Sequence, residues 1–137
     1  MASLIYNSAI DDMARGAIDF DTDTFKAMLV TSSYTPNKDT HDKRDDVTNE
    51  VSGTGYTAGG VTTACTVTKD TANDKVTLQF AAVSWATSTI TARALVIYKS
   101  TGTASTDALV AYNDFGSDVS STAGTFSVAA STITLQN

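Results

Sequence analysis

The sequence contains very little of several residue types that would point to a particular class of protein. Its 137 residues include one cysteine, Cys65, one histidine, His41, and one proline. A single cysteine cannot form an internal disulfide, which excludes a fold held together by disulfides. Lys and Arg number 9 against 15 Asp and Glu, so the net charge is -6. This charge disfavours nucleic acid and anionic membrane surfaces, and we expect neither as a partner.

Long hydrophobic runs are also missing. The longest runs, such as Ala94–Tyr98, have the length of one strand and fall far short of the roughly 20 apolar residues that a membrane-spanning helix needs. The opening residues, MASLIYNSAI, lack the basic start and apolar centre of a signal segment. We therefore expect a protein that is made and folded in a reducing cytoplasm.

Threonine and valine are abundant, and runs of apolar and β-branched residues between turn formers predict strands. The expected hairpins pair residues 17–20 with 25–31, 61–68 with 76–80, and 94–98 with 108–112; residues 125–128 and 132–135 form a last one. The run 94–98 is continuously apolar, so both of its faces should be covered. Helical spacing predicts one short helix at Ala9–Arg15, capped by Asn7 or Ser8. Core aromatics are expected at Trp85, Tyr98, Tyr112 and Phe115.

These patterns predict a mainly β fold: an antiparallel β-sandwich or jelly-roll-like barrel with one short N-terminal helix and a long polar loop. Residues 1–137 should form a single β domain, because no linker or internal repeat divides them. Residues 32–60 are the long polar loop, with a dense charged patch and flexible glycines. Loops of this length tend to be functional, so we expect 32–60 to be a partner-binding connection. We also expect that the domain folds without residues 37–60.

Several residues are candidates for contacts with a partner. Tyr34 and Tyr56 lie in the polar segment without apolar periodicity, and Arg93 is a cation beside a buried run. An internal ion pair between Arg93 and Asp114 is the simpler interpretation of that arginine. The complete set of partner-binding candidates is Tyr34, Asn37, His41, Arg44, Tyr56 and Arg93.

Two motifs imitate ligand sites without completing them. Gly53–Ala58 matches the glycine pattern of dinucleotide-binding loops, but a strand rather than a helix should follow, so a flexible loop is the better interpretation. Asp19, Asp21 and Asp23 imitate the start of a calcium loop whose sixth and twelfth positions should be Gly and Glu. This sequence has Thr24 and Val30 there, which favours a solvated hairpin turn.

His41 and Cys65 do not complete a reactive site either. His41 lies among aspartates, and a single imidazole without a second histidine or cysteine is weak support for a divalent-ion site. Cys65 falls on the apolar face of its strand, as a small core residue would. We therefore expect no catalytic residue, no metal and no cofactor, and a protein that is not an enzyme.

Short blocks that extend over most of the chain carry a family resemblance. They are Leu4–Asn7, Tyr34–Pro36, Thr40–His41, Asn49–Val51, Gly53–Tyr56, Gly59–Gly60, Ala92–Lys99, Gly102–Thr103, Leu109–Tyr112 and Asp114–Gly116. In this order they resemble a family of small virion structural proteins of tailed bacteriophages. One departure lies near the end, where relatives often have a Trp-containing strand and this chain has Thr125–Ala129.

The resemblance implies a viral structural protein and no catalytic residue. The implied role is head decoration, or cement: a homo-oligomer, expected to be a homotrimer, that binds the major capsid protein on the outer capsid surface of the virion. Synthesis would take place in the host bacterial cytoplasm. The alternative is a tail, fibre or baseplate β module, or a glycan-binding adhesion domain in which Tyr34, Asn37 and Tyr56 form a shallow sugar site. An enzyme is the least favoured function.

Overall fold

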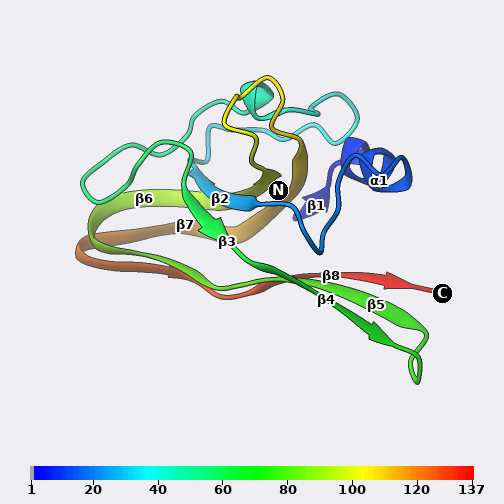
Figure 1. The fold of residues 1–137 in the computed structure, drawn as a ribbon. Coiled ribbons are helices and arrows are strands. Elements are labelled where there is room, and N and C mark those ends of the chain that lie inside the picture. The colour runs from blue at the N-terminus through cyan, green and yellow to red at the C-terminus, as the bar shows by residue number, and fades with distance from the viewer. Residues whose placement is uncertain (1) are drawn as a thin grey trace.

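The computed structural model, which describes residues 2–137, consists of two antiparallel sheets and one α-helix (Figure 1). A five-stranded sheet has the order β1-β7-β6-β2-β3, and a three-stranded sheet has the order β4-β5-β8. The elements are β1 (Leu4–Ile5), α1 (Asn7–Ala14), β2 (Phe25–Val30), the 3₁₀-helix η1 (Arg44–Asp46), β3 (Val61–Thr63), β4 (Cys65–Asp70), β5 (Lys75–Phe80), β6 (Val83–Lys99), β7 (Leu109–Val128) and β8 (Ser131–Gln136). The predicted sandwich-type fold with one short N-terminal helix is confirmed.

The long strands β6 and β7 bend back on themselves, and Figure 1 shows the turn at the left-hand end of the molecule. Their register shifts between Trp85 and Ser88 and again before Ile90, and Thr87 has a φ of 50°. Irregularities of this kind bend a strand. The buried Ser88 hydroxyl lies 3.0 Å from the carbonyl oxygens of both Trp85 and Gly124. Its single O–H can donate to either carbonyl, so it supplies one hydrogen-bond donor where the ladder is interrupted.

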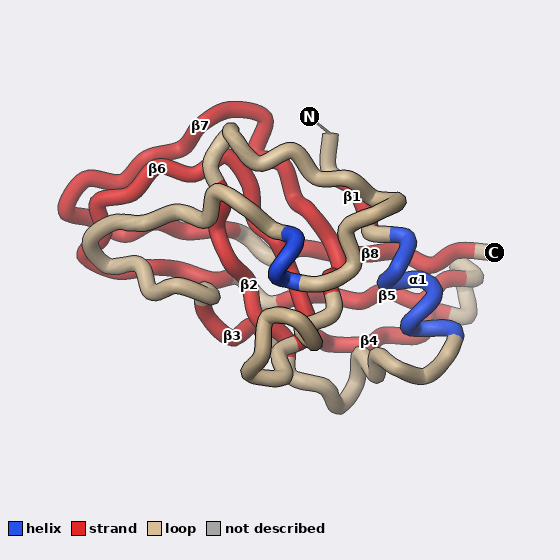
Figure 2. Tube along the Cα trace, turned by 90° about the horizontal axis from the view of Figure 1, so that it is seen from above, coloured by secondary structure: helices blue, strands red, loops and turns tan. Residues whose placement is uncertain are grey.

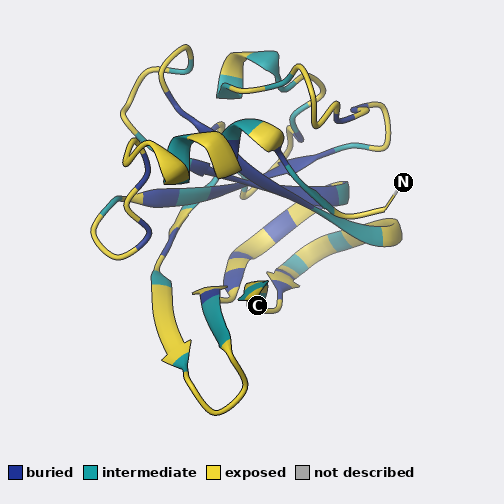
Figure 3. Cartoon of the chain, turned by 90° about the vertical axis from the view of Figure 1, so that its right-hand side faces the viewer, coloured by how far each residue is buried: buried dark blue, intermediate teal, exposed yellow. Residues whose placement is uncertain are grey.

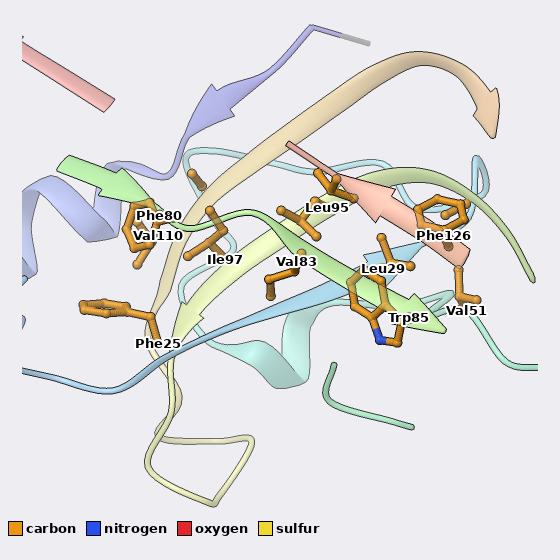
Figure 4. Packing of buried hydrophobic residues seen from close by; sticks show 14 of the residues in the cluster. Phe25, Leu29, Val51, Phe80, Val83, Trp85, Leu95, Ile97, Val110 and Phe126 are labelled. Carbon is orange, nitrogen blue, oxygen red and sulfur yellow. The ribbon is translucent and has the colours of Figure 1, made fainter. Parts of the chain in front are cut away.

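Both faces of the inner part of β6 are buried, as the continuous apolar run predicts. Leu95 and Ile97 belong to the main core between the sheets, together with Trp85, Phe25 and other side chains (Figure 4). The alternate residues on the opposite face belong to a second cluster, which we call the tyrosine cluster: Tyr6, Met28, Val30, Tyr34, Ala94, Val96, Tyr98, Leu109 and Tyr112. The expectation that Trp85, Tyr98, Tyr112 and Phe115 contribute to the core is confirmed.

The segment 32–60 covers the tyrosine cluster, and in Figure 2 the loops lie across the strands of the large sheet. Tyr34 and Val51 are both buried, and the glycine at position 60 has a φ of 74°. A Cβ atom at Gly60 would collide with the carbonyl oxygen of Ala27 on β2. The expectation that the domain folds without residues 37–60 is therefore wrong, because this part of the segment closes one side of the sheet.

Strand pairing differs from the sequence-based expectation in three places. Residues 17–20 form no strand, and β2 pairs with β3 and β6 instead. The predicted strand 61–68 divides at Ala64: β3 joins the large sheet, whereas β4 forms the expected hairpin with β5. The end of β7 pairs with the start of β6, and β8 pairs with β5, so the last predicted hairpin is wrong. Alternation identifies a strand but not its neighbour.

The helix begins two residues earlier than predicted. Tyr6 is the N-cap residue and its side chain makes no capping hydrogen bond, so neither Asn7 nor Ser8 caps the helix. Ala9 is the buried residue, whereas Ile10 is 53% exposed. No helix within residues 2–137 is long and apolar enough to cross a membrane.

We predict that Gly60→Ala strongly destabilises the protein, because the added methyl group collides with backbone and the positive φ is strained as well. The matched control is Gly102→Ala, which also has a positive φ but no atom within 4 Å of the added Cβ. The control should lose about 1 kcal/mol of stability from φ alone. Gly60→Ala should lose about 3 kcal/mol or more, or fail to fold. Urea unfolding measures both, and equal losses would contradict close packing of 32–60 on β2.

Candidate functional site

Tyr34 and His41 join Tyr6 in a chain of hydrogen bonds inside the tyrosine cluster. The Tyr34 hydroxyl lies 2.9 Å from the Tyr6 hydroxyl and 3.0 Å from His41 Nδ1. Because the Asn37 backbone N–H also donates to Nδ1, at 3.3 Å, this nitrogen is an acceptor. Tyr34 therefore donates to His41, and Tyr6 donates to Tyr34. Burial raises the pKa of both phenols, so they remain protonated donors.

Tyr56 closes a second network. Its hydroxyl donates to Glu50 Oε1 at 2.7 Å and accepts the Leu29 N–H at 3.0 Å. Glu50 also accepts the Gly59 N–H at 2.6 Å, and the Tyr98 hydroxyl donates to the Gly59 carbonyl at 2.6 Å. Burial, opposed by the Leu29 hydrogen bond, raises the pKa of Tyr56. This network ties the glycine-rich end of 32–60 to β2 and β6.

Arg44 anchors the middle of the segment through a buried carboxylate. Its Nε lies 2.7 Å from Asp107, which is 1% exposed, and its guanidinium lies 5.3 Å from the centre of the Tyr98 ring. Asp107 also accepts the N–H and the hydroxyl of Thr101, at 2.6 and 2.8 Å. Burial acts to raise the pKa of Asp107, but these hydrogen bonds and Arg44 outweigh it and lower the pKa below its usual value.

The remaining candidates are Arg93 and Asn37. Arg93 Nε lies 2.8 Å from Asp114, so the predicted internal ion pair is confirmed, and this hydrogen bond helps lower the pKa of Asp114 to about 2. Asn37 is exposed, and its side-chain oxygen accepts the N–H groups of Asp39 and Thr40 in a turn. The other candidates are buried or half-buried in internal contacts. The expectation that Tyr34 is an exposed contact residue is therefore wrong, and Tyr56 is an anchor.

The residues considered for chemistry also have internal roles. Cys65 packs against the main core, and burial together with Asp21 raises the pKa of its thiol to about 11, so it is no thiolate nucleophile at neutral pH. The carboxylate of Asp23 accepts the Asp19 N–H and forms an ion pair with Lys99 at 2.9 Å. The residues from Asp19 to Asp23 therefore form a turn closed by their own hydrogen bonds. Within residues 2–137 no group of three or more His, Cys, Asp or Glu residues is placed to hold a metal ion.

The glycine motif at 53–56 packs closely against the bend of β6. A Cβ at Gly53 would lie 2.7 Å from the Thr89 carbonyl oxygen, and one at Gly55 would lie 2.8 Å from Ser88 Cα. Thr54 forms an isolated bridge with Thr89. Gly53 and Gly55 have positive φ, and their lack of a side chain also allows the loop to approach the strand backbone.

The outer side of 32–60 is therefore a fixed polar surface, and it is the candidate functional site. Its exposed residues include Asn37–Thr40, Asp42, Asp45, Thr48, Asn49 and Ser52–Gly55. The hydrogen-bond networks beneath it fix the backbone that carries these side chains. Such a surface can bind a partner by shape and polar contacts. The sequence analysis did not identify Glu50 and Asp107, the two carboxylates that anchor the segment 32–60. The one available signal was that Glu50 is the only glutamate in the chain.

No protein-family model matches this chain, and no curated protein and no solved structure was found to be similar to it. Its function is therefore inferred from its own residues and fold.

We predict that Tyr34→Phe lowers stability without changing the fold. The missing hydroxyl leaves the buried Tyr6 hydroxyl without its acceptor and removes one of the two hydrogen bonds that His41 Nδ1 accepts, at a cost of about 1–3 kcal/mol. Tyr112→Phe is the matched control, because the Tyr112 hydroxyl has no hydrogen-bond partner among residues 2–137. Urea unfolding should separate the two variants. Equal stability of both variants would show that the Tyr34 hydroxyl is not part of a buried network.

We also predict that Asp107 contributes to the loss of stability in acid. Its pKa is lowered from 3.8 in the folded state, so its contribution is present above that pH and is lost as the pH falls through the folded-state value. Asp107→Asn should be less stable by about 2–3 kcal/mol at pH 7, because it loses charged hydrogen bonds. Its stability should then fall less than that of the wild type between pH 5 and pH 3. Unfolding midpoints across this range test the prediction, and parallel pH profiles would refute it.

Proposed function

We propose that this protein is a non-enzymatic virion structural protein of a bacteriophage, which binds the major capsid protein on the outer capsid surface and stabilises the lattice. The observation that supports the proposal is the position, in the structure, of the short sequence blocks that resemble bacteriophage virion proteins. Those between Tyr34 and Gly60 all belong to the covering segment, and Leu4–Asn7 joins them through the Tyr6 to Tyr34 hydrogen bond. Ala92–Lys99 and Leu109–Tyr112 are the strands directly beneath.

The arrangement of these blocks favours a binding surface over a reaction site. The side chains that could in principle act as a base, a nucleophile or a metal ligand have structural roles instead. His41 accepts two hydrogen bonds, and Cys65 packs on the core. A surface that is ordered before contact loses little conformational entropy on binding. Binding by a rigid polar face is therefore the activity for which this chain is best suited.

The mechanism is a binding linkage. A protein that binds the assembled lattice but not its separate subunits stabilises assembly by its binding free energy, and no bond needs to be made or broken. Many copies on one particle would add this contribution at each site. The polar segment 32–60 is the side that faces the lattice in this proposal.

The sugar site of the alternative function is not formed. Tyr34 is buried, and the Tyr56 hydroxyl is held by Glu50 and Leu29, so Asn37 alone of the three expected residues is exposed. This removes the aromatic platform on which a glycan-binding role depended. A tail, fibre or baseplate location is an outcome that the following experiment can reveal.

We predict that the double variant Lys38→Glu/Asp45→Lys weakens attachment to particles that lack the protein by about tenfold, equivalent to about 1.4 kcal/mol. Both residues are exposed on 32–60, and the exchange preserves the net charge. The matched control is Lys69→Glu/Asp118→Lys, which places the same exchange on exposed residues of β4 and β7.

Co-sedimentation with particles at increasing protein concentration measures attachment, and unchanged unfolding midpoints show that both variants are folded. The control should bind like the wild type. Wild-type binding by the Lys38/Asp45 variant would show that 32–60 is not the contact surface. Binding of the wild type to host cells or isolated tails, and not to heads, would contradict the capsid role.

A further inference from the structure

Strand β8 forms an open edge of the three-stranded sheet. All six of its residues, Ser131–Gln136, pair in unbroken register with β5, and among residues 2–137 no strand pairs with its other side. It contains no charged residue, no proline, no glycine and no bulge. Natural sheet edges usually carry at least one of these devices, because an unprotected edge pairs readily with another strand.

The outermost strands of the large sheet are very short, and the other outermost strand of the small sheet is charged. β1 has only 2 residues and β3 only 3. β4, the opposite edge of the same small sheet, carries Lys69 and Asp70. β8 is therefore distinctive among these edge strands in having both length and no charge.

The side chains of β8 itself are apolar on one face and uncharged on the other, although Lys75 of β5 lies beside Gln136 on the outer face. Thr132, Thr134 and Gln136 are exposed on the outer face. Ile133 and Leu135 point to the inner face, where they line an apolar cavity of about 110 Å³ beneath α1. Figures 1 and 3 show that the small sheet projects from the body of the molecule, so the end of β8 is accessible from the side.

We infer that β8 pairs antiparallel with β8 of a second copy of this chain across a two-fold axis. The strand is self-complementary when the axis passes through Thr134. In that register Ile133 lies opposite Leu135 on the inner face, and Thr132 lies opposite Gln136 on the outer face. The two small sheets would become one continuous six-stranded sheet, with their apolar inner faces side by side.

Charge favours this edge for self-association. Each copy has a net charge of -6, so two copies repel one another over much of their surface. β8 is a neutral strip on which two copies can meet without placing like charges opposite each other. A foreign strand would need its own sequence match, whereas the second copy supplies that match by symmetry.

The interface is small, which determines how it must be measured. One pair of six-residue strands buries less than the roughly 800 Å² per partner of a standard stable interface, so the dimer should dissociate on dilution. Its two-fold symmetry also distinguishes it from the homotrimer that the family resemblance implies. The pairing does not depend on the proposed capsid function.

The test uses sedimentation equilibrium of the full chain over a wide concentration range. The wild type should be a reversible dimer. Thr134→Glu and Thr134→Lys each place like charges opposite one another at the axis, so each should weaken dimerisation about tenfold. An equimolar mixture of the two variants should recover dimers, because Glu then lies opposite Lys. The control is Thr77→Lys, which pairs with Thr134 from the central strand β5 and should dimerise like the wild type.

Unfolding midpoints of the three variants should agree, since all the substitutions lie on the same outer face. A wild type that is monomeric at every concentration, or trimeric, would overturn the inference. So would Thr134 variants that dimerise like the wild type, a mixture that recovers nothing, or an equal effect of Thr77→Lys.

Discussion

The burial of both faces of the central β6–β7 hairpin is the constraint on which the rest of the structure depends. Leu95 and Ile97 need one apolar cover, and Val96 and Tyr98 need another. The folded-back ends of β6 and β7, with the small sheet, supply the first. The segment 32–60 supplies the second without regular strands, so its backbone groups and polar side chains must find partners in other ways.

Those partners are buried or half-buried acidic and phenolic groups. Glu50 accepts two hydrogen bonds and Asp107 accepts three, and Tyr34 links Tyr6 to His41. A buried polar network is stable only when each member is satisfied, and this requirement fixes one arrangement of the loop. The same contacts that complete the fold therefore give the outer surface a defined shape. Recognition by this surface needs no separate ordering step, which is the link between the fold and the proposed binding role.

Sequence periodicity predicted what depends on local pattern. The double burial of 94–98, the β4–β5 hairpin and the Arg93–Asp114 pair followed from apolar runs, turn formers and the cost of an unpaired cation. Periodicity could not predict the bend at Ser88, because the small polar residues 86–89 fit a loop between two strands as well as a bend within one strand. It also mistook a polar segment for a dispensable one. Tyrosines buried through hydrogen-bonded hydroxyls have no periodic signature.

A density map of the purified virion at a resolution that traces strands tests the central claim most directly. The account predicts that the protein lies on the outer capsid surface, with the exposed residues of 32–60 against the major capsid protein and the projecting β4-β5-β8 sheet away from that contact. Density for the protein in the tail or baseplate would contradict the capsid role. A copy on the capsid whose small sheet, rather than 32–60, contacts the lattice would contradict the assigned surface.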